Sequence, residues 1–378
     1  MNGTHRSINA PGDRVADAVS CPFHLGVWLA DEAFLEKRPA GRVVLWWHEG
    51  TQMTGRWTRF EPPHDLAWTL TSEDGRRVDT SFHMESDGSV TRLSVLGDRV
   101  SEDWAEALEN LAAYVETGVN RREMQRPMVG ISYDILDPEK ARASGADIDG
   151  GVLVSATVEN GGAQAAGIMT GDLLELVGAT RVRDWPDLVT ALRGHKAGDT
   201  IDLTYWRNGQ RSRVTATLGG RETPAVETDP QAMAERVASY ARERLSSLQE
   251  VIGGADDRAA GHQPGPGEWS AKEVLSHLYN GELWWRDWAL GAAYGTRVAE
   301  YPERYDEALR RFVQGVPIGD VVSALVDAIR ATEVLQGSLL ADNPAPSVMH
   351  AIAVEMHREC AHFDEHMAQV KAAIASAG

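Results

Sequence analysis

The chain has 378 residues, of which 43% are hydrophobic and 25% charged, a composition typical of folded globular protein and not of disorder. Because hydrophobic cores split into domains of roughly 100 to 200 residues, we expect two or three domains. Lys and Arg total 37 against 56 Asp and Glu, and the net charge of −19 repels phosphate backbones and anionic lipids, which argues against nucleic acid as a partner.

The amino-terminal segment and the two cysteines indicate the compartment. Residues 1–11 lack the apolar core of a signal peptide, and no window reaches the ~18 uninterrupted apolar residues of a membrane span. Cys21 and Cys360 lie in different predicted domains and no Cys-x-x-Cys occurs, so no disulfide framework is expected. We therefore predict a cytoplasmic protein with reduced thiols and no membrane partner.

Residues 1–122 have the pattern of an antiparallel sheet closed by one helix. Short alternating runs are broken by turn sequences such as Glu-Pro-Pro-His-Asp and Ser-Glu-Asp-Gly. After Ser101, which we expect to cap the helix, Trp104, Leu108 and Val115 recur at helical spacing up to Gly118. One amphipathic helix is therefore predicted to pack on the sheet.

The segments 8–15, 55–57 and 60–68, together with this closing helix, resemble the SRPBCC (START-like) superfamily, in the branch named for activators of a heat-shock-protein ATPase. The resemblance implies an α+β helix-grip fold that encloses an apolar cavity. Tryptophans can line such a cavity and bind a small apolar molecule, and ordinary core packing explains them equally well. The candidates are Trp28, Trp46, Trp57, Trp68 and Trp104.

Residues 127–220 again read as strands, with one helix predicted at 185–192. Gly167 and Gly171 occupy turns that need unrestricted φ, and Asn208-Gly209 is a hairpin signal. This ordered series of turns resembles a PDZ domain of the bacterial HtrA-associated type, a mainly β fold with helices. Related modules often follow a serine protease, but neither Gly-x-Ser-Gly-Gly nor Gly-x-Ser-x-Gly occurs here, so a protease is not expected.

In PDZ domains the carboxyl terminus of a partner protein or peptide adds as a strand to a sheet edge, and loop amides bind its carboxylate. The resemblance implies that the helix 185–192 forms one wall of this groove. The alternative is a groove that binds nothing specific and a module that spaces its neighbours. The loop and the start of the strand that would bind the peptide are Met128, Val129, Gly130, Ile131, Ser132 and Tyr133.

Residues 221–229 are small, polar and Pro-containing, which indicates a linker, and residues 230–378 are helical in pattern. Helices are predicted near 231–253, 270–293, 318–341 and 345–375, a count and length typical of an all-α four-helix bundle. Ser270 and Glu273 match a capping box, so the second helix should begin there. The fold class predicted for the whole chain is multidomain: a helix-grip domain, a PDZ domain and a bundle.

Three histidines of the bundle are candidate metal ligands. His277 lies on an apolar stripe that also holds Trp284 and Trp288, so it should point inward. His362 and His366 are four residues apart, and their imidazoles should project from one helical face. Together the three histidines can form a three-nitrogen site with room for water, the arrangement of catalytic zinc. The alternative is a packed or solvated histidine pair.

Four other side chains near the last two histidines fall on different faces of the same predicted helix. Glu359 shares the histidine face and is a candidate to orient a ligand's second nitrogen, with a solvated acid as the alternative. His350, His357 and Cys360 point elsewhere and are left out of the predicted site.

The Trp269-Ser270 pair before this helix, His277 on it, and His362-x-x-x-His366 followed by Gln369 resemble the DinB-like superfamily. The resemblance implies a four-helix bundle that binds one divalent metal ion, such as Zn, Ni or Mn, through the three histidines. The family includes transferases and isomerases that use low-molecular-weight thiols, so such a thiol is an expected cofactor. Glu365 and Met367 depart from commoner members, which leaves the substrate and the thiol open.

Two functions are consistent with this organisation. The first is a metal-dependent enzyme of thiol-dependent transferase or hydrolase type, with the other two domains recruiting a ligand and a peptide. The second is a nonenzymatic adaptor or sensor with a structural metal. Coordination distinguishes them, because a catalytic ion keeps one position open, whereas a fourth protein ligand such as Glu359 would close it.

Overall fold

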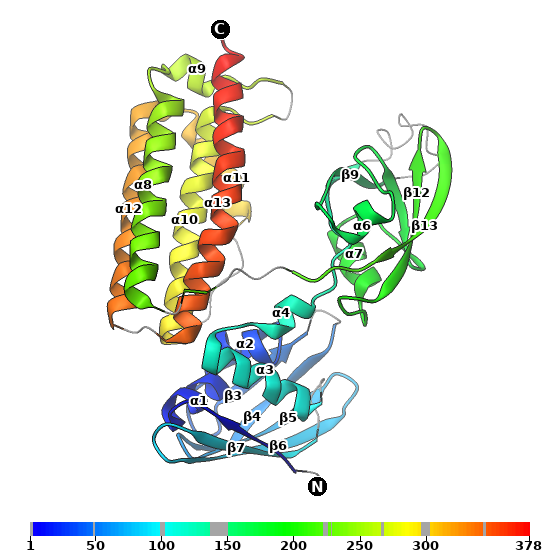
Figure 1. Cartoon of the computed structure of the whole chain (residues 1–378), viewed down its shortest axis with the longest axis vertical. Coiled ribbons are helices and arrows are strands. Elements are labelled where there is room, and N and C mark those ends of the chain that lie inside the picture. The colour runs from blue at the N-terminus through cyan, green and yellow to red at the C-terminus, as the bar shows by residue number, and fades with distance from the viewer. Residues whose placement is uncertain are drawn as a thin grey trace.

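The computed structural model describes residues 3–47, 50–98, 103–136, 150–221, 226–227, 229–265, 268–295, 303–342 and 345–378. Figure 1 shows a β-rich unit at the amino end, a second β-rich unit in the middle of the chain and a helical region at the carboxyl end. The chain is therefore multidomain, as its length predicts.

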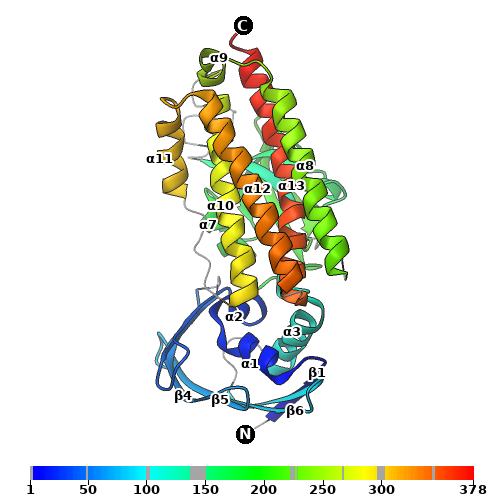
Figure 2. The same cartoon turned by 90° about the vertical axis from the view of Figure 1, so that its left-hand side faces the viewer.

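The N-terminal unit, from β1 to α4, is built on an antiparallel seven-stranded sheet of order β1-β7-β6-β5-β4-β3-β2. Its strands alternate buried and exposed side chains, so one face packs on the core. Three helices, α1 (Gly12–Ser20), α2 (Pro22–Trp28) and α3 (Trp104–Thr117), lie inside the curve of the sheet (Figure 2). The strands are β1 (Gly3–Ile8), β2 (Glu32–Leu35), β3 (Arg42–Trp46), β4 (Gln52–Glu61), β5 (Asp65–Ser72), β6 (Arg77–Ser86) and β7 (Thr91–Gly97).

Helix α3 is the helix predicted to close this sheet, and its buried side chains include Trp104, Leu108 and Val115. Its amino-terminal cap differs from the prediction. Ser101 lies outside the described residues, and the side chain of Asp103 accepts the amide N–H of Ala105. The helix ends at Gly118 with φ +76°, a conformation that favours glycine.

The middle unit, from β8 to β13, has its own apolar core and follows the short helix α4 (Arg121–Gln125). Its sheet has the order β13-β12-β10-β9-β8, with β11 paired to β10. Helix α7 begins and ends at the predicted residues, and Asn208 and Gly209 have positive φ in the β12–β13 hairpin. The elements are β8 (Ile131–Leu136), β9 (Gly151–Thr157), α6 (Gly162–Ala165), β10 (Leu173–Val177), β11 (Thr180–Arg181), α7 (Trp185–Leu192), β12 (Thr200–Arg207) and β13 (Gln210–Thr217).

The helical region contains the four predicted long helices, each within two residues of its expected ends. They are α8 (Pro230–Ile252), α10 (Ala271–Tyr294), α12 (Ile318–Asp342) and α13 (Pro346–Ala375), and they run side by side in both views (Figures 1 and 2). The capping box that starts α10 is present, with Ser270 and Glu273 bonded reciprocally. Two shorter helices, α9 (Asp257–Gly261) and α11 (Glu303–Val313), were not predicted. No helix in the described part of the chain is long and apolar enough to cross a lipid bilayer.

The helical region packs end-on against the N-terminal unit, and one apolar cluster runs through both. The Phe23 ring on α2 meets the Trp288 ring on α10 edge to face, with centroids 5.1 Å apart. Gly118 lies so close to Pro346 and His350 on α13 that a Cβ would collide with both. We call this contact between α2–α3 and the ends of α10 and α13 the interdomain seam. Because its core is shared, the two parts are coupled by apolar burial.

Candidate functional site

The fold brings the three predicted metal ligands together in the interior of the helical region. His277 lies on α10, and His362 and His366 lie one turn apart on α13. The Nε2 atom of His362 is 3.2 Å from Nε2 of His277 and 3.0 Å from Nε2 of His366. All three imidazoles are half-buried, and one ring nitrogen of each lies within 4.8 Å of the others. The three Nε2 atoms therefore converge on one point.

The opposite ring nitrogen of each histidine faces an oxygen. His277 Nδ1 lies 3.2 Å from Asp306 Oδ1, and His366 Nδ1 lies 2.9 Å from Gln369 Oε1. His362 Nδ1 lies 3.6 Å from Glu359 Oε1, which is close but longer than a hydrogen bond. Oxygen acceptors at Nδ1 hold the proton there, as in metal-bound histidines whose second nitrogen donates to an outer oxygen.

This arrangement fits a divalent cation. With Nδ1 protonated on His277 and His366, both present an Nε2 lone pair to His362, which has only one proton to donate. The single Nε2 proton of His362 can be donated to only one of the other two Nε2 atoms. The remaining Nε2 atom then faces its neighbours without a proton between them, unless a cation binds there. Zn–N bonds of about 2.0–2.1 Å at tetrahedral angles place nitrogen atoms roughly 3.3 Å apart, close to the observed separations.

Electrostatics in the site also favours neutral imidazoles on two of the three residues. Burial lowers the pKa of His277, although the Asp306 carboxylate opposes this shift. Burial likewise lowers the pKa of His366. The pKa of His362 is raised by its contact with the Glu359 side chain, which outweighs burial. Only neutral imidazole binds a metal ion, so His277 and His366 are prepared for coordination at neutral pH.

Glu359 lies on the outer side of His362, where the sequence predicted an orienting carboxylate. It is 6% exposed, and the indole N–H of Trp285 donates to its Oε1. Behind it, the buried side chains of Arg244 and Glu282 form an ion pair. Glu359 thus approaches His362 from the Nδ1 side and does not join the converging Nε2 atoms.

Two partners of this site, Asp306 and Trp285, were missed by the sequence reasoning. Asp306 belongs to α11, a short helix with two kinds of local signal that could have revealed it. These are the i,i+4 pairs Asp306–Arg310 and Glu307–Arg311, and apolar residues at helical spacing, Tyr305, Leu309, Phe312 and Val313. The predicted apolar stripe contained Trp284 and Trp288 but not Trp285. In the structure Trp285 is more buried than either of them, because α11, α12 and α13 all pack around α10.

An aromatic and a cationic side chain border the histidines. The ring of Trp269 lies 5.3 Å from that of His277 and is stacked 6.3 Å from that of His366. The guanidinium of Arg310 lies 4.3 Å from the centre of the Trp269 ring, a cation–π contact. The site therefore has an apolar wall at one side, and the guanidinium next to this wall is paired with the carboxylate of Asp306.

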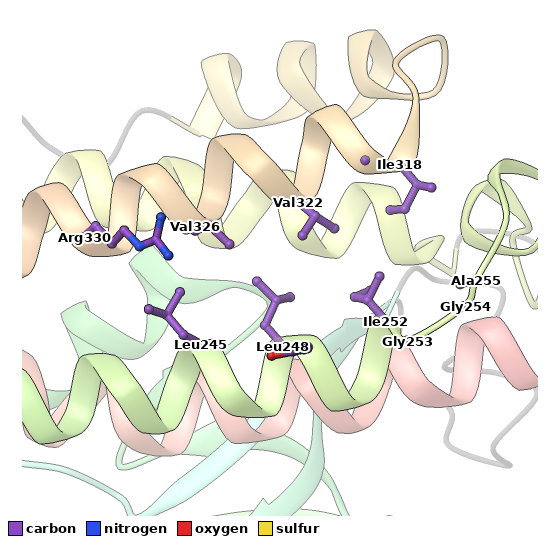
Figure 3. A pocket seen from close by; sticks show the side chains of 12 residues that line it. Leu245, Leu248, Ile252, Gly253, Gly254, Ala255, Ile318, Val322, Val326 and Arg330 are labelled. Atoms are coloured by element: carbon purple, nitrogen blue, oxygen red, sulfur yellow. The ribbon is translucent and has the colours of Figure 1, made fainter.

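A separate apolar groove of about 460 Å³ lies between α8 and α12 (Figure 3). Leu245 and Leu248 on α8 face Val322 and Val326 on α12 across it, and Arg330 lies at one end. None of the three histidines lines this groove. It is therefore distinct from the candidate metal centre.

In the middle unit, β8 is the edge strand of the described sheet and is paired only with β9 along its length. Gly130, just before it, has φ +82°, and the preceding Met128 pairs with Gly219. Burial raises the pKa of Tyr133 on β8, with a further contribution from the nearby carboxylate of Asp184, which caps α7. The predicted loop and helix therefore border one strand edge, a geometry suited to strand addition.

Most of the candidate cavity tryptophans pack together in the N-terminal core. Trp57 and Trp68 have ring centroids 5.2 Å apart, and Phe82 lies between Trp68 and Trp104 with edge contacts to both. The Trp28 indole donates to the carbonyl of Ala18, and Trp46 is only half-buried on β3. Among the described atoms, the buried indole N–H groups of Trp57 and Trp68 have no acceptor.

Comparison with known proteins identifies the middle unit. A family model described as PDZ domain matches residues 127–218. The serine protease Do-like HtrA of Lactococcus lactis subsp. cremoris (strain MG1363) is 27% identical over 157 residues, 38% of this chain and 38% of its own length. A probable periplasmic serine endoprotease DegP-like of Pseudomonas putida (strain GB-1) is 28% identical over 213 residues, 51% of this chain and 42% of its own. The middle unit is thus a PDZ domain of the HtrA type.

The chain spans only about two fifths of the length of these curated relatives. Among solved structures, the HtrA-type protease AlgW with decapeptide has a TM-score of 0.27 at 14% identity, covering 54% of this chain and 79% of that one. CalU16 from Micromonospora echinospora has a TM-score of 0.24 at 23% identity, covering 28% of this chain and 70% of that one. Scores this low do not establish a shared fold.

Proposed function

We propose that the helical region is a DinB-like, metal-dependent enzyme of thiol-dependent transferase or hydrolase type, joined to an SRPBCC (START-like) helix-grip unit and a PDZ domain. The observation that carries this proposal is the convergence of three Nε2 atoms from His277, His362 and His366 on one point. His277 and His366 each have an oxygen within hydrogen-bond distance of Nδ1, the outer arrangement typical of metal ligands, and Glu359 lies 3.6 Å from Nδ1 of His362.

The position of Glu359 supports an open coordination site over a closed, structural one. Its carboxylate is held by Trp285 on the Nδ1 side of His362, away from the converging nitrogens. Within the described residues, the three histidines form the metal-binding group here without a fourth Cys, Asp or Glu ligand. An ion with three protein ligands keeps a position for a nucleophile or substrate.

His277, His362 and His366 would hold the ion, which would act as a Lewis acid and lower the pKa of a coordinated nucleophile toward ~7. The chain's own residues then have defined tasks. Asp306 and Gln369 accept hydrogen bonds from the Nδ1 atoms of His277 and His366, which would leave both Nε2 lone pairs available to the ion. Trp269 offers an apolar surface to a substrate, and Arg310 stacks on this ring while it pairs with Asp306. The thiol, the substrate and the choice among Zn, Ni and Mn remain predictions.

The other two parts would bring ligands to this enzyme. The PDZ domain is proposed to bind a protein or peptide carboxyl terminus at the loop 128–131 and the edge of β8. The N-terminal unit is proposed to bind a small apolar molecule with an oxygen acceptor, because the buried indoles of Trp57 and Trp68 have no described acceptor. The cytoplasmic location predicted from the sequence stays a prediction.

The alternative function is a nonenzymatic adaptor or sensor with a structural metal. The shared core at the interdomain seam favours it, because ligand binding in the N-terminal unit can be transmitted through packed side chains to the helical region. In that case the metal would stabilise the fold and the PDZ domain would bind the partner.

Metal analysis and thermal unfolding of the purified full chain test the metal centre. We expect one divalent ion per chain at the histidines and a melting temperature that rises with ion concentration, because an ion that prefers the folded state stabilises it. His277→Ala, His362→Ala and His366→Ala should each remove most of this rise, whereas His357→Ala, an exposed control on α13, should not. If wild type gains no stability from zinc, nickel or manganese, the three-histidine site is wrong.

A low-molecular-weight thiol distinguishes the enzyme from the adaptor. Added to the metal-loaded protein, it should raise the melting temperature of the wild type further and leave His277→Ala unchanged. A thiol that has no effect on the metal-loaded wild type would favour the adaptor.

A further inference from the structure

A second group of metal-binding side chains lies where α1 meets α2, outside the three-histidine centre. Asp17, Cys21 and His24 place one potential ligand atom each within 4.8 Å of the others. The Cys21 thiol donates to Asp17 Oδ1, and His24 Nε2 lies 3.4 Å from Asp17 Oδ2. Cys21 is 0% exposed and His24 is 6% exposed, so the sulfur and the imidazole are both shielded from solvent.

Local backbone geometry explains why these three residues meet. They are spaced i, i+4 and i+7, which is the spacing of one helical face. Cys21 is the carboxyl-terminal cap of α1 and the amino-terminal cap of α2, and Pro22 begins the second helix. The chain therefore turns at Cys21 without carrying His24 away from Asp17.

The second nitrogen of His24 has a buried partner, as metal ligands usually do. His24 Nδ1 lies 2.7 Å from the hydroxyl of Tyr114 on α3, and Ser347 on α13 also interacts with this phenol. In the metal-free cluster the contact of His24 with Asp17 needs a proton on Nε2. If an ion replaced that proton, Nδ1–H would donate to the phenol oxygen and the Nε2 lone pair would face the ion. Tyr114, itself in contact with Ser347, can thus orient the His24 imidazole in the way that outer hydrogen-bond partners orient a metal-bound histidine.

The cluster already holds one cation, the ammonium of Lys37, whose Nζ lies 2.9 Å from Asp17 Oδ1. Burial raises the pKa of Asp17, but hydrogen bonds from His24, Cys21 and Lys37 outweigh burial and hold that pKa below its usual range. The site therefore keeps an ionised carboxylate. The Lys37 side chain is 43% exposed, so it can leave the cluster for solvent when another cation enters.

Cys21 is not suited to be a free nucleophile. Burial and the adjacent Asp17 carboxylate raise the pKa of its thiol to about 12, so thiolate is scarce at neutral pH. A soft divalent ion overcomes the scarcity of thiolate. The ion replaces the thiol proton, which is released to solvent, and its positive charge stabilises the thiolate.

The bundle covers this cluster. Gly295, the carboxyl-terminal cap of α10, has φ +65°, and a Cβ there would collide with Cys21 Sγ. Figure 2 shows α2 directly at the end of α10, and the Phe23–Trp288 contact lies in the same place. The cluster is therefore part of the interdomain seam.

We propose that Asp17, Cys21 and His24 form a second metal site, which binds a zinc-class divalent ion at the interdomain seam and displaces Lys37 from Asp17. Sulfur, nitrogen and carboxylate oxygen are all zinc ligands, and thiolate favours zinc over calcium or magnesium. The ion would strengthen the docking of the helical region on the N-terminal unit.

Cobalt titration of the metal-stripped, reduced full chain tests this site separately from the three histidines. Only a cysteine-containing site gives a near-ultraviolet thiolate-to-cobalt charge-transfer band. We expect this band in wild type, in His277→Ala and in Cys360→Ser, whose exposed thiol is the matched control, and we expect its loss in Cys21→Ser.

Lys37→Ala keeps all three ligands and removes the competing charge. Cobalt should then bind at least about tenfold more tightly, judged from the Coulomb energy of two charges a few ångströms apart. Lys37→Ala therefore tests whether cobalt binds at Asp17, Cys21 and His24 even if Cys21→Ser does not fold. No charge-transfer band in either wild type or Lys37→Ala would overturn the proposal, as would a band that survives Cys21→Ser and disappears in Cys360→Ser.

Discussion

His350 allows the energetics of the interdomain seam to be measured. It is 7% exposed on α13 beside Gly118, and its Nδ1 has no partner among the described atoms. Burial, with a smaller contribution from Arg358, lowers its pKa from 6.5 to about 4. The unfolded chain therefore takes up a proton near pH 6.5, whereas the folded chain does so only near pH 4. The stability contributed by the neutral imidazole is complete above pH 6.5 and is lost as the pH falls toward 4.

The size of this loss follows from the two pKa values. One pKa unit corresponds to about 1.4 kcal/mol, so His350 alone should cost about 2 kcal/mol of unfolding free energy between pH 7 and pH 5. We would compare wild type with His350→Leu, and use His357→Leu as an exposed control on the same helix.

The assay is denaturant unfolding of the metal-stripped full chain, followed by far-ultraviolet circular dichroism at both pH values. Between pH 7 and pH 5, wild type and His357→Leu should lose about 2 kcal/mol more than His350→Leu. The loss of unfolding free energy in His350→Leu is subtracted from the loss in wild type, and this difference cancels the contributions of the other titrating groups. A His350→Leu protein that loses as much stability as wild type would refute the reasoning.

Three further predictions concern the other parts of the chain. Peptides with a free carboxyl terminus should bind the PDZ domain at least about tenfold more tightly than their amidated forms in fluorescence anisotropy, and equal affinities would contradict the assignment of residues 128–131. Trp285→Phe, which removes the N–H bonded to Glu359, should weaken zinc binding at the histidines in calorimetry, by up to about 10-fold because Trp285 acts only through Glu359. Trp284→Phe is its control, and an unchanged affinity in Trp285→Phe would show that Glu359 does not orient His362. Residues 228–378 alone should stay helical by circular dichroism but melt below the full chain, because Trp288 loses its cover at the seam. Equal melting temperatures would mean that the seam adds no stability.

Much of the helical region was predictable because its signals are local. A capping box fixes where α10 begins, and helical periodicity then determines which side chains share a face, so His362 and His366 were expected to project together. The same holds for the hairpin at Asn208-Gly209, since only a few residue types readily adopt positive φ. Features of this kind depend on residues within one or two turns of each other.

The partners of the histidines depended on tertiary structure. Asp306 reaches His277 from α11, 29 positions further along the chain, and Trp285 meets Glu359 from 74 positions away in the sequence. A helical wheel with a single buried stripe selected Trp284 and Trp288, whereas α10 has neighbours on several sides and buries Trp285 as well.

The interdomain seam shows the same limit on a larger scale. The linker-like composition of residues 221–229 indicates where the chain passes from one unit to the next, and it says nothing about which units touch. The spacing of Asp17, Cys21 and His24 is visible in the sequence, but the contacts with Tyr114, Lys37 and Gly295 exist only in the folded chain. Local backbone geometry determined the helices, turns and shared faces of this protein, whereas long-range packing decided which of those faces meet, because that choice depends on the burial of surfaces contributed by distant parts of the chain.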